Sequence, residues 1–190
     1  ILKRMSSIAL GMYNDVLNGL ISDDKSNLQT LSKRDVEVNR QYFLLVRLIR
    51  STLVDKRLAN AFNLENIDVL DYRVAANVLE NAGDSIVELS NFIFNFSLSK
   101  EYSKKIYDVV KTFNDVAEKS IDAFTKPDRL LAIKSISMHK EYEKKLSLLR
   151  TSLGNKKQIP LDFLDLIYMF ERIAQSWADV ADLVQPIYNE

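Results

Sequence analysis

Two short groups of oxygen-bearing side chains have a spacing that could bind a metal ion. Glu80 and Asp84 are four residues apart in a segment with helical periodicity, so their carboxylates lie on one face of the expected helix. Asp35 and Asn39 repeat this spacing in the preceding helical segment. If the two helices are antiparallel neighbours, four or more oxygen ligands can meet. Such a set suits hard cations such as Mg²⁺, Mn²⁺ or oxidised iron, and carboxylates also accept Zn²⁺.

The same spacing is also typical of a solvated helix face or a structural polar network, and spacing alone leaves both interpretations open. Arg73 and Asn77 extend the edge formed by Glu80 and Asp84, which lies roughly opposite the centre of the apolar stripe. Gly83 stands beside this edge. A glycine inside a helix costs about 0.5–1 kcal/mol relative to alanine. The position therefore predicts a close approach by a backbone, a neighbouring helix or an ion.

The sequence offers little for catalysis. It has one histidine, His139, and no cysteine, which excludes paired Glu-x-x-His di-iron motifs, thiolate nucleophiles and cysteine-based zinc sites. It also has no glycine-rich phosphate loop, dinucleotide fingerprint or nucleophile elbow. We expect His139 to be a solvated helix residue and Trp177 to belong to the core. We therefore expect no enzymatic activity.

Composition limits the class of protein further. The 190 residues carry 26 Lys and Arg against 26 Asp and Glu, and a net charge of zero argues against a general nucleic-acid or anionic-membrane binder. No apolar run approaches the length of a membrane span, and the first residues lack the apolar core of a signal peptide. We expect a cytoplasmic protein without membrane insertion. Because residue 1 is Ile1, the sequence is compatible with a fragment of a longer chain.

Hydrophobic periodicity predicts an all-α fold. Ser99 is an expected N-cap, a loop is expected at 60–66, and no run of alternating polarity is long enough for a sheet. Six amphipathic segments are expected, at 3–21, 24–57, 67–97, 100–125, Pro127–Gly154 and Pro160–Pro186. Most of them are much longer than an average helix, and this length favours a bundle of antiparallel helices.

The two halves of the chain look related. DYRVAANVLENAGD (71–84) aligns without a gap with DFLDLIYMFERIAQ (162–175), which pairs Asp71 with Asp162 and Glu80 with Glu171. A weaker match places EVNR (37–40) against EYEK (141–144). We interpret the chain as two tandem three-helix repeats in a six-helix bundle, the first at 1–98 and the second at 99–190.

Several of these strings resemble the PhoU family of phosphate-uptake regulators, particularly its archaeal branch. The resemblance rests on RMSSIALGMYNDVLNGL (4–20), RDVEVNRQYFLLVRLIR (34–50) and LDYRVAANVLENAGD (70–84). That family is built from two three-helix repeats, each with an acidic pair of pattern (Glu/Asp)-x-x-x-Asp. The resemblance implies a metal cluster on the outer face of the first repeat, carried by Asp35, Asn39, Glu80 and Asp84, with Asn39 in place of the usual acid. The metal would be a divalent or trivalent ion (Mg, Mn, Fe or Zn).

The second repeat departs from the family pattern. Glu171 is kept, but Gln175 stands where Asp is expected, and Glu143 is a loose equivalent of the second-helix position. Because the loss of acidic groups lowers the ligand charge, we expect this repeat to bind metal weakly or not at all.

The resemblance implies a non-enzymatic cytoplasmic regulator of phosphate uptake and phosphate homeostasis, in contact with a phosphate transporter or its signalling partner. We expect bound metal to tune that docking or self-association as a homodimer. An alternative is the effector or dimerisation domain of an archaeal transcription regulator whose DNA-binding domain lies upstream, so that this segment itself does not bind nucleic acid. A second alternative is a ligand-free helical scaffold. No Arg-rich nest or Gly-rich helix start is present, so we expect phosphate sensing to be indirect.

Overall fold

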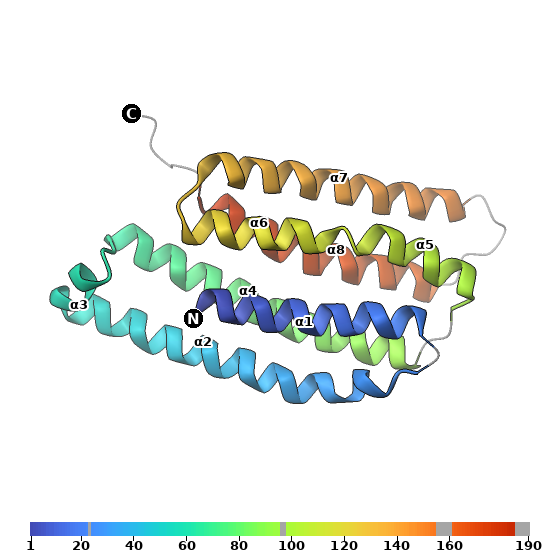
Figure 1. Cartoon of the computed structure of the whole chain (residues 1–190), viewed down its shortest axis with the longest axis horizontal. Helices are drawn as coiled ribbons and strands as arrows, with labels where there is room; N and C mark the ends of the chain where they lie inside the picture. The colour runs from blue at the N-terminus through green and yellow to red at the C-terminus, as the bar shows by residue number, and fades with distance from the viewer. Residues whose placement is uncertain (23, 96–97, 155–160, 185–190) are drawn as a thin grey trace.

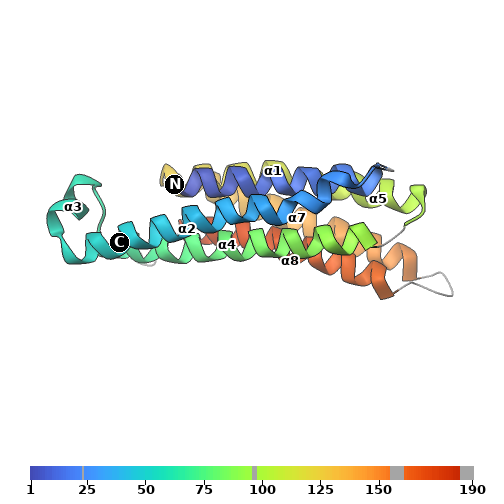
Figure 2. The same cartoon turned by 90° about the horizontal axis from the view of Figure 1, so that it is seen from below.

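The chain forms an elongated bundle of helices that run along one long axis, as Figures 1 and 2 show. The structure is a computed structural model and describes residues 1–22, 24–95, 98–154 and 161–184. Within these residues all regular structure is helical, which confirms the expected all-α fold. The elements are α1 (Leu2–Ile21), a 3-10 turn η1 (Ser26–Thr30), α2 (Leu31–Val54), α3 (Lys56–Ala61), α4 (Asn66–Asn95), α5 (Lys100–Val110), α6 (Phe113–Thr125), α7 (Arg129–Gly154) and α8 (Leu161–Asp182).

The helices pack as two groups that meet mainly along one helix of each group. In the first half, α1, α2 and α4 pack against one another, and in the second half α6, α7 and α8 do the same. The two groups are joined mainly by α4 against α8, with α1 also touching α5 and α6. The hairpin of α2 and α4 extends past the start of α1 and carries α3 at its tip (Figure 1). The repeat boundary at 98/99 stays a prediction.

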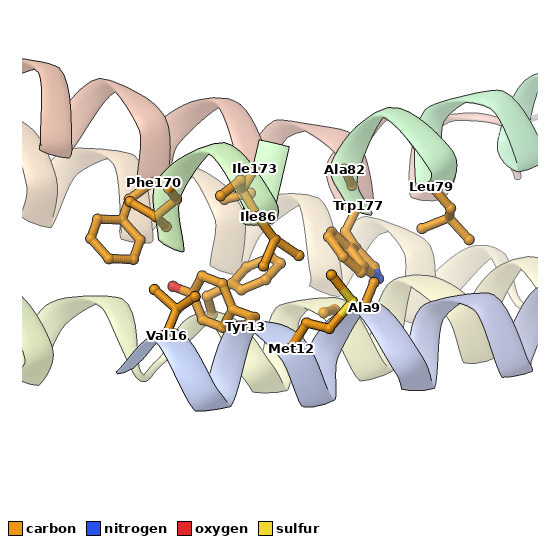
Figure 3. Packing of buried hydrophobic residues seen from close by; sticks show 14 of the residues in the cluster. Ala9, Met12, Tyr13, Val16, Leu79, Ala82, Ile86, Phe170, Ile173 and Trp177 are labelled. Carbon is orange, nitrogen blue, oxygen red and sulfur yellow. The ribbon is translucent and has the colours of Figure 1, made fainter. Parts of the chain in front are cut away.

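The core is a continuous set of apolar side chains from both groups (Figure 3). Aromatic rings meet edge to face at its centre: the ring centroid of Phe113 lies 4.9 Å from that of Tyr13 and 5.2 Å from that of Trp177. Trp177 is fully buried, as expected, and its Nε1 donates to the Ser6 hydroxyl at 2.9 Å. This bond links α8 to α1 and thus one half of the chain to the other.

The expected helix at 100–125 is divided at Lys111–Thr112 into α5 and α6. The Thr112 hydroxyl donates to the Val109 carbonyl at 2.7 Å, a local bond that competes with the helical ladder. The Val110 carbonyl accepts a hydrogen bond of 3.0 Å from the buried hydroxyl of Tyr13. A side chain from α1 therefore satisfies a backbone group that the break releases.

Other helix ends agree with the sequence or differ by local capping. Ser99 caps α5, as expected, by accepting from the Tyr102 amide, and α7 ends at Gly154. The expected helix at 24–57 begins instead with η1 and breaks at Asp55, whose carboxylate accepts from the Arg57 amide and starts α3. Pro127 precedes α7 rather than standing in its first turn, because the Asp128 side chain caps that helix at the Leu131 amide. The expected ends at Pro160 and Pro186, and residues 96–97, lie outside the described residues.

Throughout these described stretches, no helix is long and apolar enough to span a membrane.

Candidate metal centre

The contact between α2 and α4 brings the two acidic groups of the first half together at Gly83. A Cβ atom built on Gly83 would lie 2.7 Å from Oδ1 of Asp35 and 3.4 Å from Cγ1 of Val38. The first distance is shorter than any ordinary contact of a side chain. The glycine thus lets the Asp35 carboxylate lie directly against the backbone of α4, which confirms the close approach that its place in the helix predicts.

Asp35 is an incompletely satisfied carboxylate. The residue is only 8% exposed, and Oδ2 accepts a hydrogen bond of 3.0 Å from Nδ2 of Asn39. Oδ1 is buried and has no hydrogen-bond partner among the described residues. A buried oxygen without a partner is uncommon and costly. Oδ1 of Asp35 is therefore the strongest structural indication that the site binds a ligand.

Burial and the neighbouring acids both raise the pKa of the Asp35 carboxyl. Burial raises the pKa of the Asp35 carboxyl to about 6, and the negative charges of Asp84 and Glu80 add to the rise, while the Asn39 bond opposes it. The pKa of Glu80 is also raised, first by burial and then by Asp84, against the opposing charge of Arg73. The three carboxylates are therefore close enough to repel one another.

The donor chemistry of this cluster fits a hard cation, although the cluster is not a preformed cage. A cation would partner Oδ1 of Asp35 and offset the repulsion among the three acids. In the part of the chain that the structure describes, no three or more His, Cys, Asp or Glu side chains are arranged to hold a metal ion. Asn39 turns its amide nitrogen, not its oxygen, to Asp35. In this conformation it orients the carboxylate rather than offering a ligand.

Arg73 and Asn77, which continue the polar edge of α4, are engaged with α2. The Arg73 guanidinium lies 5.3 Å from the centroid of the Tyr42 ring, and the Tyr42 hydroxyl is 3.5 Å from Oδ1 of Asn77. The edge is thus part of a helix contact and not a simple solvated face.

We expect Gly83→Ala to lower the free energy of unfolding by about 1–2 kcal/mol, because the new methyl group would overlap the Asp35 carboxylate. Alanine would otherwise stabilise a helix interior by up to about 1 kcal/mol. Gly11→Ala is a matched control. Its Cβ would meet the end of the long, half-exposed Arg34 side chain. That guanidinium is paired with Asp15, but a partly exposed ion pair is worth little, so Arg34 can shift at low cost. We expect that variant to change the unfolding free energy by less than about 1 kcal/mol. Urea denaturation measures both, and a Gly83→Ala protein as stable as the wild type would contradict the close approach.

The degenerate residues of the second half also lie together. Glu143, Glu171 and Gln175 line one open pocket of about 370 Å³ with Tyr168, Arg172, Ser176 and Asp179. Burial raises the pKa of Glu171, the Glu143 charge adds to this, and Arg150 opposes it. Nε2 of Gln175 donates to Oδ1 of Asp179 at 2.6 Å. Asp179 is an acid of this pocket that the sequence analysis missed, although its i, i+4 spacing from Gln175 was visible.

His139 is buried, at 4% exposed, so the expectation of a solvated residue is wrong. Its Nδ1 lies 3.8 Å from Oε2 of Glu143, and Nε2 has no hydrogen-bond partner among the described residues. Burial lowers the pKa of the imidazole, against the opposing charges of Glu143, Asp179 and Asp182. The sequence misleads here because α7 has a weak apolar stripe, so its buried face is difficult to assign.

Comparison with known proteins agrees with this architecture. The PhoU domain family model matches residues 2–93, which include all four predicted metal-site residues. Among solved structures, the chain is similar to PhoU from Pseudomonas aeruginosa, with a TM-score of 0.76 and 18% sequence identity over 96% of this chain and 91% of that chain. A search of curated proteins finds no match. The chain thus carries a PhoU domain over residues 2–93 and has the PhoU fold over nearly its whole length, which confirms the family resemblance of its sequence.

Proposed function

We propose that this protein is a non-enzymatic, cytoplasmic regulator of phosphate uptake that acts by binding a phosphate transporter or its signalling partner. The observation that carries the proposal is the match of the PhoU domain, a family whose members are generally regulators of phosphate uptake. A bundle of long helices presents broad, rigid faces, which suit protein contacts better than they suit catalysis.

Deleting the gene in its native host tests this role. We expect the deletion strain to continue importing radiolabelled phosphate in phosphate-rich medium, where the wild type reduces uptake. A plasmid-borne copy should restore control. Equal uptake by the deletion strain and the wild type at both high and low phosphate would contradict the proposal.

We further propose that Asp35, Glu80 and Asp84 hold a divalent or trivalent metal ion (Mg, Mn, Fe or Zn), with Asn39 orienting Asp35. Support comes from Oδ1 of Asp35, which has no hydrogen-bond partner among the described residues, and from burial and neighbouring acids, which together raise the pKa of Asp35 and Glu80. Glu80 is half-buried and Asp84 exposed, so both can turn toward Asp35. A bound cation would supply the positive charge that this cluster lacks. Its presence would change the charge of the α2–α4 face, and thereby the docking of a partner or a second copy.

Isothermal titration with Mn²⁺, Mg²⁺, Zn²⁺ and Fe³⁺ tests the site. We expect Glu80→Gln/Asp84→Asn to weaken binding by at least about tenfold, because two of the three anionic ligands are neutralised. The matched control is Glu171→Gln/Asp179→Asn, which removes the same charge from the pocket of the second half and should leave the affinity unchanged. Equal binding by the wild type and the Glu80→Gln/Asp84→Asn variant would contradict this site.

A further inference from the structure

A cavity at the junction of the two halves has the lining of an anion site. It encloses about 540 Å³, within the range of about 300–1,000 Å³ that is typical of small-molecule pockets. The end of α1, Lys25 just before η1, the end of α4 and the first turns of α5 form its walls, at the right-hand end of the bundle in Figure 1. None of its described lining residues belongs to the cluster of Asp35, Glu80 and Asp84.

Among the described residues that line this cavity, lysines outnumber acids. They are Lys25, Lys100 and Lys104 against Asp108, which is itself paired with Lys111 at 2.8 Å. Nζ of Lys25 donates to the Ile93 carbonyl at 2.6 Å, which fixes that ammonium group at the cavity wall. Lys104 forms no ion pair with any residue that the structure describes. Lysine binds phosphate groups as a point charge.

A nearly buried serine supplies an independent indication of a ligand. Ser103 lines the cavity and the residue is only 7% exposed, and no hydrogen bond of its side chain to another described residue is present, so its hydroxyl is available to a ligand in the cavity. Lys100, Ser103 and Lys104 are spaced i, i+3, i+4 and share one face of the first turns of α5. The positive end of the helix dipole lies at this end of α5 and also favours an anion.

Apart from Ser22, the other described residues of the wall are mainly apolar. Leu20 and Ile93 are buried, and Leu98 is half-buried, while the Tyr107 ring stands on the same face of α5 as the lysines. A free inorganic anion would contact only the polar part of such a lining. A phosphate group attached to an organic body would use both parts.

We propose that this cavity binds a phosphate group, carried by a small organic phosphomonoester or present as free phosphate. The phosphate oxygens accept from Lys25, Lys104 and the Ser103 hydroxyl, and an organic body rests on Leu20, Ile93 and Leu98. Asp108 stands further along α5 and disfavours a longer chain of phosphates. The site arises from the packing of four elements, which explains why the sequence, with no Arg-rich or Gly-rich phosphate motif, does not predict it. It would place a phosphate-bearing effector on the protein directly.

Isothermal titration of the full chain, first freed of metal with a chelating resin, tests this site. The probes are AMP, inorganic phosphate and adenosine. We expect AMP to bind, adenosine not to bind, and Lys104→Gln and Ser103→Ala each to weaken AMP binding by at least about fivefold, as the loss of a bond to a charged group requires. Lys144→Gln removes the same charge from an exposed position on α7 and should leave AMP affinity unchanged.

Each other result is decisive. Equal affinity for AMP and inorganic phosphate would support the site with free phosphate as its ligand. Absence of binding by both at millimolar concentration, adenosine binding as tightly as AMP, or unchanged affinity in both variants would overturn the proposal. Lys104→Gln should keep wild-type Mn²⁺ binding, and Glu80→Gln/Asp84→Asn should keep wild-type AMP binding, so failure of one site is distinguishable from failure of the other.

Discussion

Replacing Trp177 with alanine should lower the free energy of unfolding by about 3–5 kcal/mol, because the variant loses a fully buried indole and gains a cavity. The cavity would lie between Phe113 of α6 and Ser6 of α1, at the point where the two halves of the chain meet. The Ser6 hydroxyl would also lose its donor. Since domains of this kind are stable by about 5–15 kcal/mol, the loss is a large share of the total.

Two further variants separate the contributions of size and hydrogen bonding. Trp177→Phe keeps most of the ring volume and should cost less than alanine, while Ser6→Ala removes only the hydrogen bond and should cost about 1 kcal/mol. Phe43→Ala, at a ring that is 58% exposed, is the control for loss of aromatic area and should change stability by less than about 1 kcal/mol. Urea denaturation followed by far-UV circular dichroism suits all four, since Trp177 is the only tryptophan. A Trp177→Ala protein within about 1 kcal/mol of the wild type would contradict the central place of this residue.

Asp35→Asn should stabilise the metal-free protein at neutral pH by about 2 kcal/mol, since a pKa rise to about 6 is a penalty on the ionised form. The folded protein binds this proton more tightly than the unfolded chain does. The wild type therefore loses stability as pH rises from about 4 to about 6, and the penalty is fully present above that range. The asparagine variant has no carboxyl to titrate there.

Urea denaturation at a series of pH values between about 4 and 8 checks this, and the difference between variant and wild type should grow through the titration range. Glu118→Gln is the control, because it removes one negative charge from an exposed position on α6. Addition of a bound cation should reduce the advantage of the variant, since the metal relieves the same repulsion in the wild type. A pH-independent difference would mean that Asp35 is not the group responsible.

The sequence predicts the helices well because apolar spacing directly reflects burial. The stripes of α1, α8 and the later part of α4 supply much of the core, whereas Ile67, Leu70 and Val74 near the start of α4 have helical spacing but are exposed. The two unpredicted breaks come from interactions that periodicity does not encode. The break after Val110 depends on Tyr13, which is almost a hundred residues away and reaches that carbonyl only in the folded chain. The break at Asp55 depends on an N-cap within an otherwise suitable helical pattern.

The sequence indicates which residues belong to the candidate metal centre, but not their burial or their hydrogen bonds. Spacing identifies Asp35, Glu80 and Asp84, and Gly83 signals a close approach, because all four lie on regular helices. The buried, partnerless oxygen of Asp35 and the orientation of Asn39 depend on how α2 lies against α4. A pattern along one helix does not specify that register. The expectation for His139 fails for a different reason, because the weak apolar stripe of α7 does not mark its buried face.

The contact of α4 with α8 has a consequence for any attempt to divide the protein. Each of these helices packs against its own group and also against the opposite one. Either half on its own would therefore expose a long apolar surface to water. Two fragments expressed separately and divided at 98/99 should therefore be insoluble or should associate with each other. The intact chain should unfold in a single thermal transition. The predicted repeat boundary at 98/99 is therefore not expected to separate two independently stable units.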